Sequence, residues 1–238
     1  MSGFWYGVGL QWKMDIRSKT LLITCYVVPL LFYMVMGGIF TSINPEAKLS
    51  LIQSMTVFGV STGAIIGLPP SLVEIYGSDI KKVYKANGVP LYLGVVSIFL
   101  SAFIHLFIMC AIIYLTAPIV FGAATPDHSL LYFGSLVIFI AVSLSIGSVL
   151  GLLVKNQAKL TMVSQMIFLP SIMISGIMFP VNLLPSFIEI VGRLFPATWG
   201  YKLMLENYFY FGNLWPMLVI FSAAFILCSI LLRRLQAE

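Results

Sequence analysis

Six long stretches of this 238-residue sequence contain no Asp, Glu, Lys or Arg, and this feature constrains the fold more than any other. An α-helix needs about 20 mainly apolar residues to cross a bilayer, and each stretch is longer than that. Transmembrane β-strands would instead give alternating segments of about ten residues. We therefore predict an all-α integral membrane protein with six transmembrane helices, at residues 20–43, 49–72, 90–117, 129–154, 160–178 and 214–232.

The overall composition agrees with a membrane environment. Hydrophobic residues make up 60% of the chain and charged residues only 9%, whereas an ordinary soluble domain has roughly a quarter charged residues. A soluble fold of this size would lack the polar side chains to cover its surface. The sequence therefore indicates a single transmembrane domain that extends over residues 1–238.

The net charge of +5 is explained by topology rather than by nucleic-acid binding. Cytoplasmic loops of membrane proteins carry an excess of Lys and Arg. With six spans, only Lys48, Arg193 and Lys202 fall on the outer side. The other ten basic residues share the inner side: Lys13, Arg17, Lys19, Lys81, Lys82, Lys85, Lys155, Lys159, Arg233 and Arg234. We therefore expect both termini in the cytoplasm, and we expect the membrane to be the plasma membrane of a bacterial cell.

The first 19 residues are amphipathic. Trp5, Val8, Trp12 and Ile16 recur at helical spacing and share one face. Such a helix can lie in the membrane interface with its tryptophans among the lipid headgroups. We expect an interfacial helix at 1–19, and the alternative is a plain cytoplasmic cap on the first span.

Small residues recur every fourth position in two spans. Gly59, Gly63 and Gly67 form one stripe, and Gly147 and Gly151 follow Ser143 in the other. A stripe of small residues lets a second helix backbone approach closely. The stripes predict helix packing within one chain or, alternatively, the seam of a dimer.

The most charged part of the sequence lies between the second and third spans. Ser78 is a suitable helix N-cap after Gly77, and Asn87-Gly88 is a stop signal before Pro90. Ile80, Val83 and Tyr84 have i, i+3, i+4 spacing and would share an apolar face. We predict a short cytoplasmic helix within 74–87 that docks a partner, with Glu74, Gly77, Ser78, Ile80, Lys81, Lys82, Val83 and Tyr84 as its contact residues. Alternatively, the lysines only enforce topology.

The fifth apolar stretch is interrupted by prolines. Proline removes a backbone donor and breaks or kinks a helix, and broken backbone at membrane depth must be surrounded by protein or a water-filled cavity. We predict a span that ends near 178 and an external re-entrant hairpin at 179–201, in which Glu189 and Arg193 pair at i, i+4. The residues that mark the hairpin are Ser175, Gly176, Phe179, Pro180, Pro185, Glu189, Arg193 and Pro196.

Motifs for independent chemistry are missing. The sequence has no phosphate-binding G-x-x-x-x-G-K-[ST] loop, no H-E-x-x-H and no G-x-S-x-G, so we assign no catalytic, cofactor-binding or metal-binding residues. His105 stands alone in its span, either as a satisfied neutral side chain or as a proton or substrate contact. Because the spans lack the carboxylates of ion-driven carriers, we expect a separate subunit to supply the energy.

Taken in order along the chain, these features resemble the permease subunits of type-2 ATP-binding-cassette (ABC) exporters. That family has an acidic residue, Gly-Thr, a basic or apolar run and a Pro between spans two and three, and here Glu74, Gly77-Ser78, Lys81-Lys82 and Pro90 occupy those places. Ser78 replaces the usual Thr, and the usual Arg near the acidic residue is absent. After span five the family shows Ser-Gly, Phe-Pro, Leu-Pro and a later Pro before an aromatic residue, which match Ser175-Gly176, Phe179-Pro180, Leu184-Pro185, Pro196 and Tyr201.

The resemblance implies a permease half that dimerises with a second copy, or with a related chain, in the lipid bilayer. It also implies a cytoplasmic ABC ATPase, which binds ATP and Mg²⁺ and docks on the 74–87 helix, and export of a drug, peptide, lipid or polysaccharide. The apolar spans favour an amphiphilic cargo. The alternatives are polysaccharide export, an intramembrane enzyme, and a membrane subunit that does not transport.

Overall fold

The computed structural model describes residues 9, 11–16, 18–78, 80–178, 185–206, 208 and 210–237. Throughout these ranges the regular structure is helical, and they contain no strand. Among the described residues, five helices are long and apolar enough to cross a membrane: Ile23–Ile43, Leu51–Tyr76, Tyr92–Phe121, Ser129–Leu153 and Phe211–Gln236. The all-α membrane fold expected from the sequence is thus confirmed, with five spans by this measure.

The first two spans each contain a π-helical turn. The first runs through α2 (Lys19–Leu22), η1 (Ile23–Val27) and α3 (Val28–Ile43), and the short η2 (Pro45–Leu49) follows. The second runs through α4 (Leu51–Thr62), η3 (Gly63–Gly67) and α5 (Leu68–Tyr76). Pro29 follows the first π turn and Pro69 the second, and a proline leaves the preceding turn without its i→i−4 donor. The widened turns accommodate that loss.

Two spans continue the bundle after the short α6 (Ile80–Ala86). Helix α7 (Tyr92–Phe121) extends past Pro118, beyond the predicted end of this span at 117. Pro118 lies in the last turn, so it removes only a hydrogen bond near the end of the helix, and Gly122 caps Phe121 with a φ of 62°, a left-handed C-terminal conformation. Helix α8 (Ser129–Leu153) follows after a short loop.

The fifth apolar stretch forms the shorter α9 (Gln157–Met173), a helix of 17 residues with Pro170 in its last turn. Two short helices, α10 (Ser186–Gly192) and α11 (Pro196–Leu205), come next, and α12 (Phe211–Ala237) completes the chain. The predicted hairpin at 179–201 therefore corresponds to α10 and part of α11, while residues 179–184 lie outside the described ranges.

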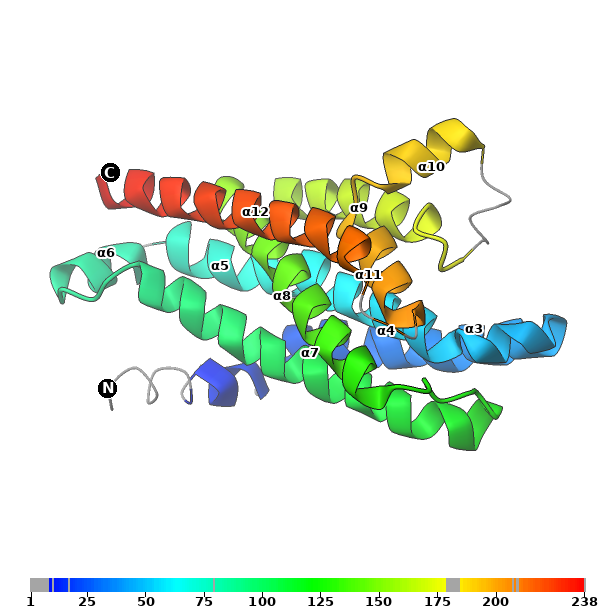
Figure 1. The fold of residues 1–238 in the computed structure, drawn as a ribbon. Coiled ribbons are helices and arrows are strands. Elements are labelled where there is room, and N and C mark those ends of the chain that lie inside the picture. Colours follow the sequence, from blue (N-terminus) through cyan, green and yellow to red (C-terminus); the bar gives the residue numbers. More distant parts are fainter. Residues whose placement is uncertain are drawn as a thin grey trace.

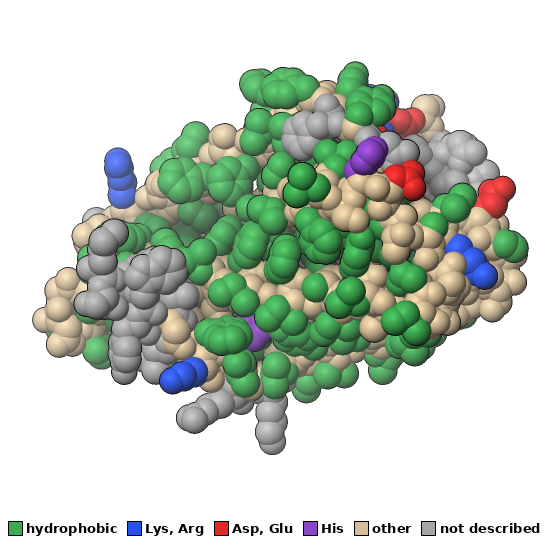
Figure 2. All heavy atoms as spheres, turned by 60° about the horizontal axis from the view of Figure 1, so that its bottom comes forward, with side chains coloured by type: hydrophobic (Ala, Val, Ile, Leu, Met, Phe, Trp, Pro, Cys, Tyr) green, Lys and Arg blue, Asp and Glu red, His purple; other side chains and the backbone are tan. Residues whose placement is uncertain are grey.

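The helices are arranged around α8, which packs against α5, α7, α11 and α12. Helix α6 and the C-terminal end of α12 lie at one end of the molecule, and α10 and the C-terminal end of α3 lie at the other (Figure 1). The Leu51–Tyr76 span is almost wholly buried, whereas the first and last spans are largely exposed. Hydrophobic side chains cover the middle of the face in Figure 2, with charged side chains toward its ends, as a bilayer environment requires.

Candidate functional site

Both ends of α6 are fixed by local hydrogen bonds. The Ile80 backbone N–H donates to Ser78 Oγ at 3.3 Å, and that hydroxyl donates to the Glu74 carbonyl at 2.5 Å. At the other end, the Val89 N–H donates to the Tyr84 carbonyl at 2.9 Å, while Gly88 has a φ of 65°. This is the Schellman arrangement of a helix C-terminus. The short helix is therefore defined by its own sequence.

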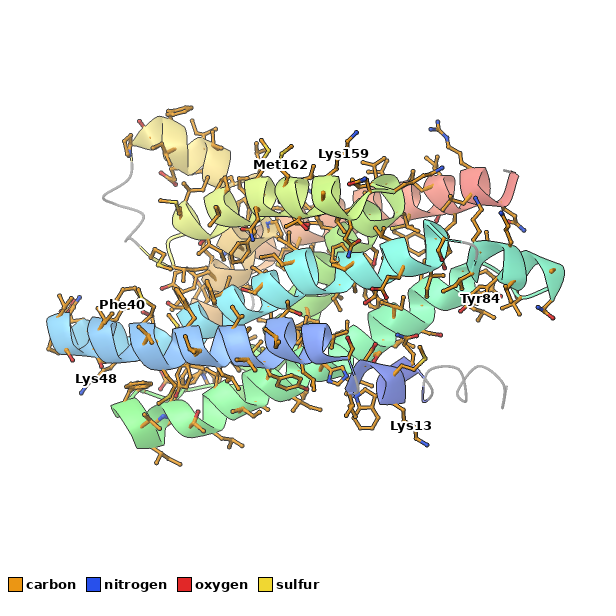
Figure 3. The ribbon with its side chains drawn as sticks, turned by 180° about the vertical axis from the view of Figure 1, so that it is seen from behind. Lys13, Phe40, Lys48, Tyr84, Lys159 and Met162 are labelled. Atoms are coloured by element: carbon orange, nitrogen blue, oxygen red, sulfur yellow. The ribbon has the colours of Figure 1, made fainter. Side chains whose placement is uncertain are left out.

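The three apolar residues expected to share a face of α6 do not all point outward. Ile80 and Val83 are 44% and 57% exposed. Tyr84 (labelled in Figure 3) is half-buried and packs on the start of α7, where its ring lies 3.3 Å from the position of a Cβ at Gly94. Tyr84 therefore holds α6 against the bundle, and Ile80 and Val83 remain as its outward apolar surface.

Basic side chains surround the start of α6. Lys81 and Lys82 line a cavity of about 450 Å³ with Lys155, which follows α8, and with Tyr76, Gly77 and Ser78. Glu74 is exposed one turn before the helix. The structure thus brings Lys81 and Lys82, two of the residues predicted for docking, to one surface with Lys155, which was predicted only to lie on the cytoplasmic side.

The hairpin residues occupy the opposite end of the molecule. Arg193 Nη2 lies 2.9 Å from Glu189 Oε1, and this hydrogen bond and charge lower the pKa of Glu189. Ser175 donates to the Ile172 carbonyl, and Gly176 turns the chain with a φ of 91°. Pro185 immediately precedes α10, and Pro196 is the first residue of α11. Phe179 and Pro180 lie outside the described residues.

The glycine stripes pack against other helices of the same chain. A Cβ at Gly63 would lie 2.3 Å from Leu106 of α7, and one at Gly59 would lie 2.5 Å from Met109. Gly67 faces Thr24 and Cys25 of the first span, Gly147 faces the Ala64 carbonyl, and Gly151 faces Leu72. All five glycines of the two stripes therefore lie in close contact with other helices of the chain.

A buried polar cluster joins the N-terminal helical segment, residues 11–16, to α7. Asp15 is only 5% exposed, and its carboxylate accepts hydrogen bonds from Ser101 Oγ at 2.5 Å and Gln11 Nε2 at 2.8 Å. Burial raises the pKa of Asp15 above its ordinary value, although the two hydrogen bonds act in the opposite direction. One turn along α7, His105 Nδ1 shares a 2.8 Å hydrogen bond with the Tyr26 hydroxyl.

Asp15 was not singled out in the sequence analysis. Two signals were present: Asp15 is the one acidic residue before Glu46, and Ser101 and His105 are four residues apart in a span otherwise almost free of polar groups. An acidic residue at the edge of a membrane span needs a partner, because a lone buried charge is costly.

The apolar face of the predicted interfacial helix at 1–19 is described only in part, since Trp5 and Val8 lie outside the described residues.

Together, the long apolar helices and the short α6 that packs beside them define a multi-pass transmembrane protein. A family model described as ABC-2 type transporter matches residues 3–209. The chain belongs to this family, and it is the transmembrane permease of an ABC transporter, a kind of subunit that associates with an ABC ATPase subunit and has no ATP site of its own. A comparison with curated proteins finds no match.

Proposed function

We propose that this chain is one half of an ABC exporter that moves an amphiphilic cargo out of a bacterial cell. Two copies, or this chain and a related one, would enclose the pathway in the plasma membrane. A cytoplasmic ATPase that binds ATP and Mg²⁺ would drive it through the 74–87 segment. The single observation that carries the proposal is α6, which is anchored by Tyr84 and presents Ile80 and Val83 to the outside.

The anchoring is what makes α6 suitable for transmitting force. Its N-terminus continues from α5 through Gly77 and Ser78, and its Tyr84 ring rests on α7 at Gly94. A displacement of α6 would therefore act on the second and third spans together. Binding and hydrolysis of ATP in the partner would shift the spans between inward-facing and outward-facing states, because the partner binds the two states with different affinity.

The proposed topology requires a sixth span, which we assign to α9. A helix of 17 residues is about 26 Å long at 1.5 Å per residue, which is at the lower limit for crossing the hydrocarbon core. With α9 inside the membrane, α6, Lys155 and the C-terminus share the cytoplasmic side. Helices α10 and α11 then lie on the outer side, where we place the re-entrant hairpin.

The function is tested by reconstituting the chain with its ATPase in inverted vesicles. ATP should drive uptake of a fluorescent amphiphilic dye into the vesicle lumen, the equivalent of export from the cell. A vesicle with the ATPase but without this chain is the control for passive partitioning. Uptake that proceeds equally without ATP, or dye movement in the opposite direction, would contradict export.

A further inference from the structure

A small polar cavity lies at the end of the molecule opposite α6. It has a volume of about 200 Å³ and is bordered by the start of α4, the loop between α7 and α8, and the end of α11. Its described lining contains two carboxylates, Asp127 and Glu206, together with Gln53 and His128, and it contains no Lys or Arg. The acidic side chains visible in Figure 2 also lie toward this end of the molecule.

Two oxygen atoms of this lining are buried and accept no hydrogen bond within the described part of the chain. They are Oε1 of Gln53, a side chain that is only 5% exposed, and Oε2 of Glu206. Buried acceptors are normally satisfied, since an unsatisfied one loses its hydration without compensation. Their presence on one cavity points to a missing donor.

The neighbouring groups do not supply that donor. Glu206 Oε1 accepts a hydrogen bond from Asn213 Nδ2 at 2.6 Å, which leaves Oε2 for another partner. The Lys202 ammonium lies over the Trp199 ring, 5.5 Å from its centroid. The Tyr132 hydroxyl is hydrogen-bonded to Thr56 at 2.7 Å. Burial raises the pKa of Glu206, an effect that Asn213 and Lys202 partly offset.

The side chains that line the cavity determine which kind of cation they can bind. Within the described residues no three Asp, Glu, His or Cys side chains come close enough together to hold a metal ion. A primary ammonium carries one positive charge and three N–H donors, which match a carboxylate and a neighbouring amide oxygen. We propose that this cavity binds a primary ammonium group.

Two kinds of molecule carry a primary ammonium group at the outer surface of the membrane in the proposed exporter. One is an ethanolamine phospholipid of the outer leaflet, and the other is an amphiphilic amine that is itself exported. The placement on the outer side rests on the proposed topology, whereas binding of the ammonium group does not depend on transport.

Binding is tested on the full chain, purified in complex with its ATPase in detergent and without ATP. We expect n-butylammonium to raise the thermal midpoint in a concentration-dependent manner, because a ligand that binds the folded state stabilises it. Tetramethylammonium, which has the charge without N–H donors, should bind more weakly, and 1-butanol should have no effect. Equal stabilisation by all three compounds would overturn the proposal without any variant being needed.

Variants then locate the site. Glu206→Gln should weaken butylammonium binding by about tenfold or more, because the charge-assisted hydrogen bond is lost. Gln53→Leu should weaken it by a smaller factor. Glu189→Gln removes a carboxylate of α10 outside the cavity and is the matched control, which should bind like the wild type. Unchanged affinity in folded Glu206→Gln would contradict the assignment.

The source of the ammonium group is tested separately. If it is a lipid, mass spectrometry of the complex extracted from equimolar phosphatidylethanolamine and phosphatidylcholine vesicles should show retention of the ethanolamine lipid in the wild type and not in Glu206→Gln. If it is a cargo, Glu206→Gln should reduce uptake of a cationic amphiphile and leave a neutral analogue unchanged. If neither difference is found, both sources are excluded, and unchanged butylammonium binding in Glu206→Gln would overturn the site itself. A failure of transport alone would count against the proposed function and would leave butylammonium binding intact.

Discussion

The Ser101 hydroxyl donates a 2.5 Å hydrogen bond to Oδ2 of Asp15, so that a buried carboxylate ties the N-terminal helical segment to α7. The two residues are 86 positions apart in the sequence. Their contact fixes the segment that precedes the first span against the middle of the bundle. Next to it, the Tyr26–His105 hydrogen bond joins the π turn of the first span to the same face of α7.

Replacement of Asp15 by Ala should destabilise the protein by about 1–3 kcal/mol, because Ser101 and Gln11 lose their common acceptor. The thermal midpoint of the purified chain in detergent measures the effect. Lys13→Ala is the matched control, since Lys13 lies on the same segment and points away from the helices (Figure 3). Equal midpoints for Asp15→Ala and the wild type would show that the contact is not stabilising.

Gly147→Ala should be more damaging than Gly63→Ala, although both positions are closely packed. A Cβ at Gly147 would lie 2.0 Å from the Ala64 carbonyl oxygen, which is backbone and cannot rotate away. At Gly63 the obstacle is the end of the Leu106 side chain, which can change its rotamer. Overpacking costs about 1–3 kcal/mol, and we expect Gly147→Ala at or beyond the upper limit.

The yield of monodisperse protein and its thermal midpoint measure this difference. Gly134→Ala is a control on the same helix as Gly147, because a Cβ there meets no atom within 4 Å. The order of effects should be Gly147→Ala, then Gly63→Ala, then Gly134→Ala, and a reversal of the first two would contradict the packing described here.

The proposed topology predicts which loops are accessible from outside the cell. Single cysteines at 48 and 128 should react with an impermeant maleimide in intact cells, whereas cysteines at 82 and 156 should react only after the membrane is opened. The background must lack Cys25, Cys110 and Cys228. His128, Lys82 and Asn156 are exposed, so poor reaction there would not be caused by burial. Strong labelling at 82 in intact cells is incompatible with six spans.

The sequence was sufficient to predict the long apolar helices and insufficient to predict how they pack. Long charge-free stretches identify membrane helices because the bilayer imposes one requirement on all of them. The contact of Asp15 with Ser101 depends on how the chain folds back over α7, and no local pattern encodes it. The same holds for Tyr84: helical spacing placed it beside Ile80 and Val83, but its side chain turns to Gly94 because α6 folds onto α7.

The π turns of the first two spans could have been predicted from prolines inside the apolar stretches. Pro29, Pro69 and Pro70 stand inside apolar stretches, where the loss of backbone donors must be accommodated. Glycine stripes, in contrast, are ambiguous in principle, since close approach of a helix in the same chain and of one in a second copy require the same residues.

The most direct test of the central claim, that α6 couples the ATPase to the spans, is the substitution Val83→Asp. Val83 is 57% exposed, so the variant should fold with an unchanged thermal midpoint. A carboxylate placed in an apolar contact is costly, and the account predicts that the variant loses the co-purified ATPase and ATP-dependent transport at matched membrane levels, whereas Lys82→Ala has a smaller effect. A Val83→Asp variant that retains both the bound ATPase and full transport would contradict the claim.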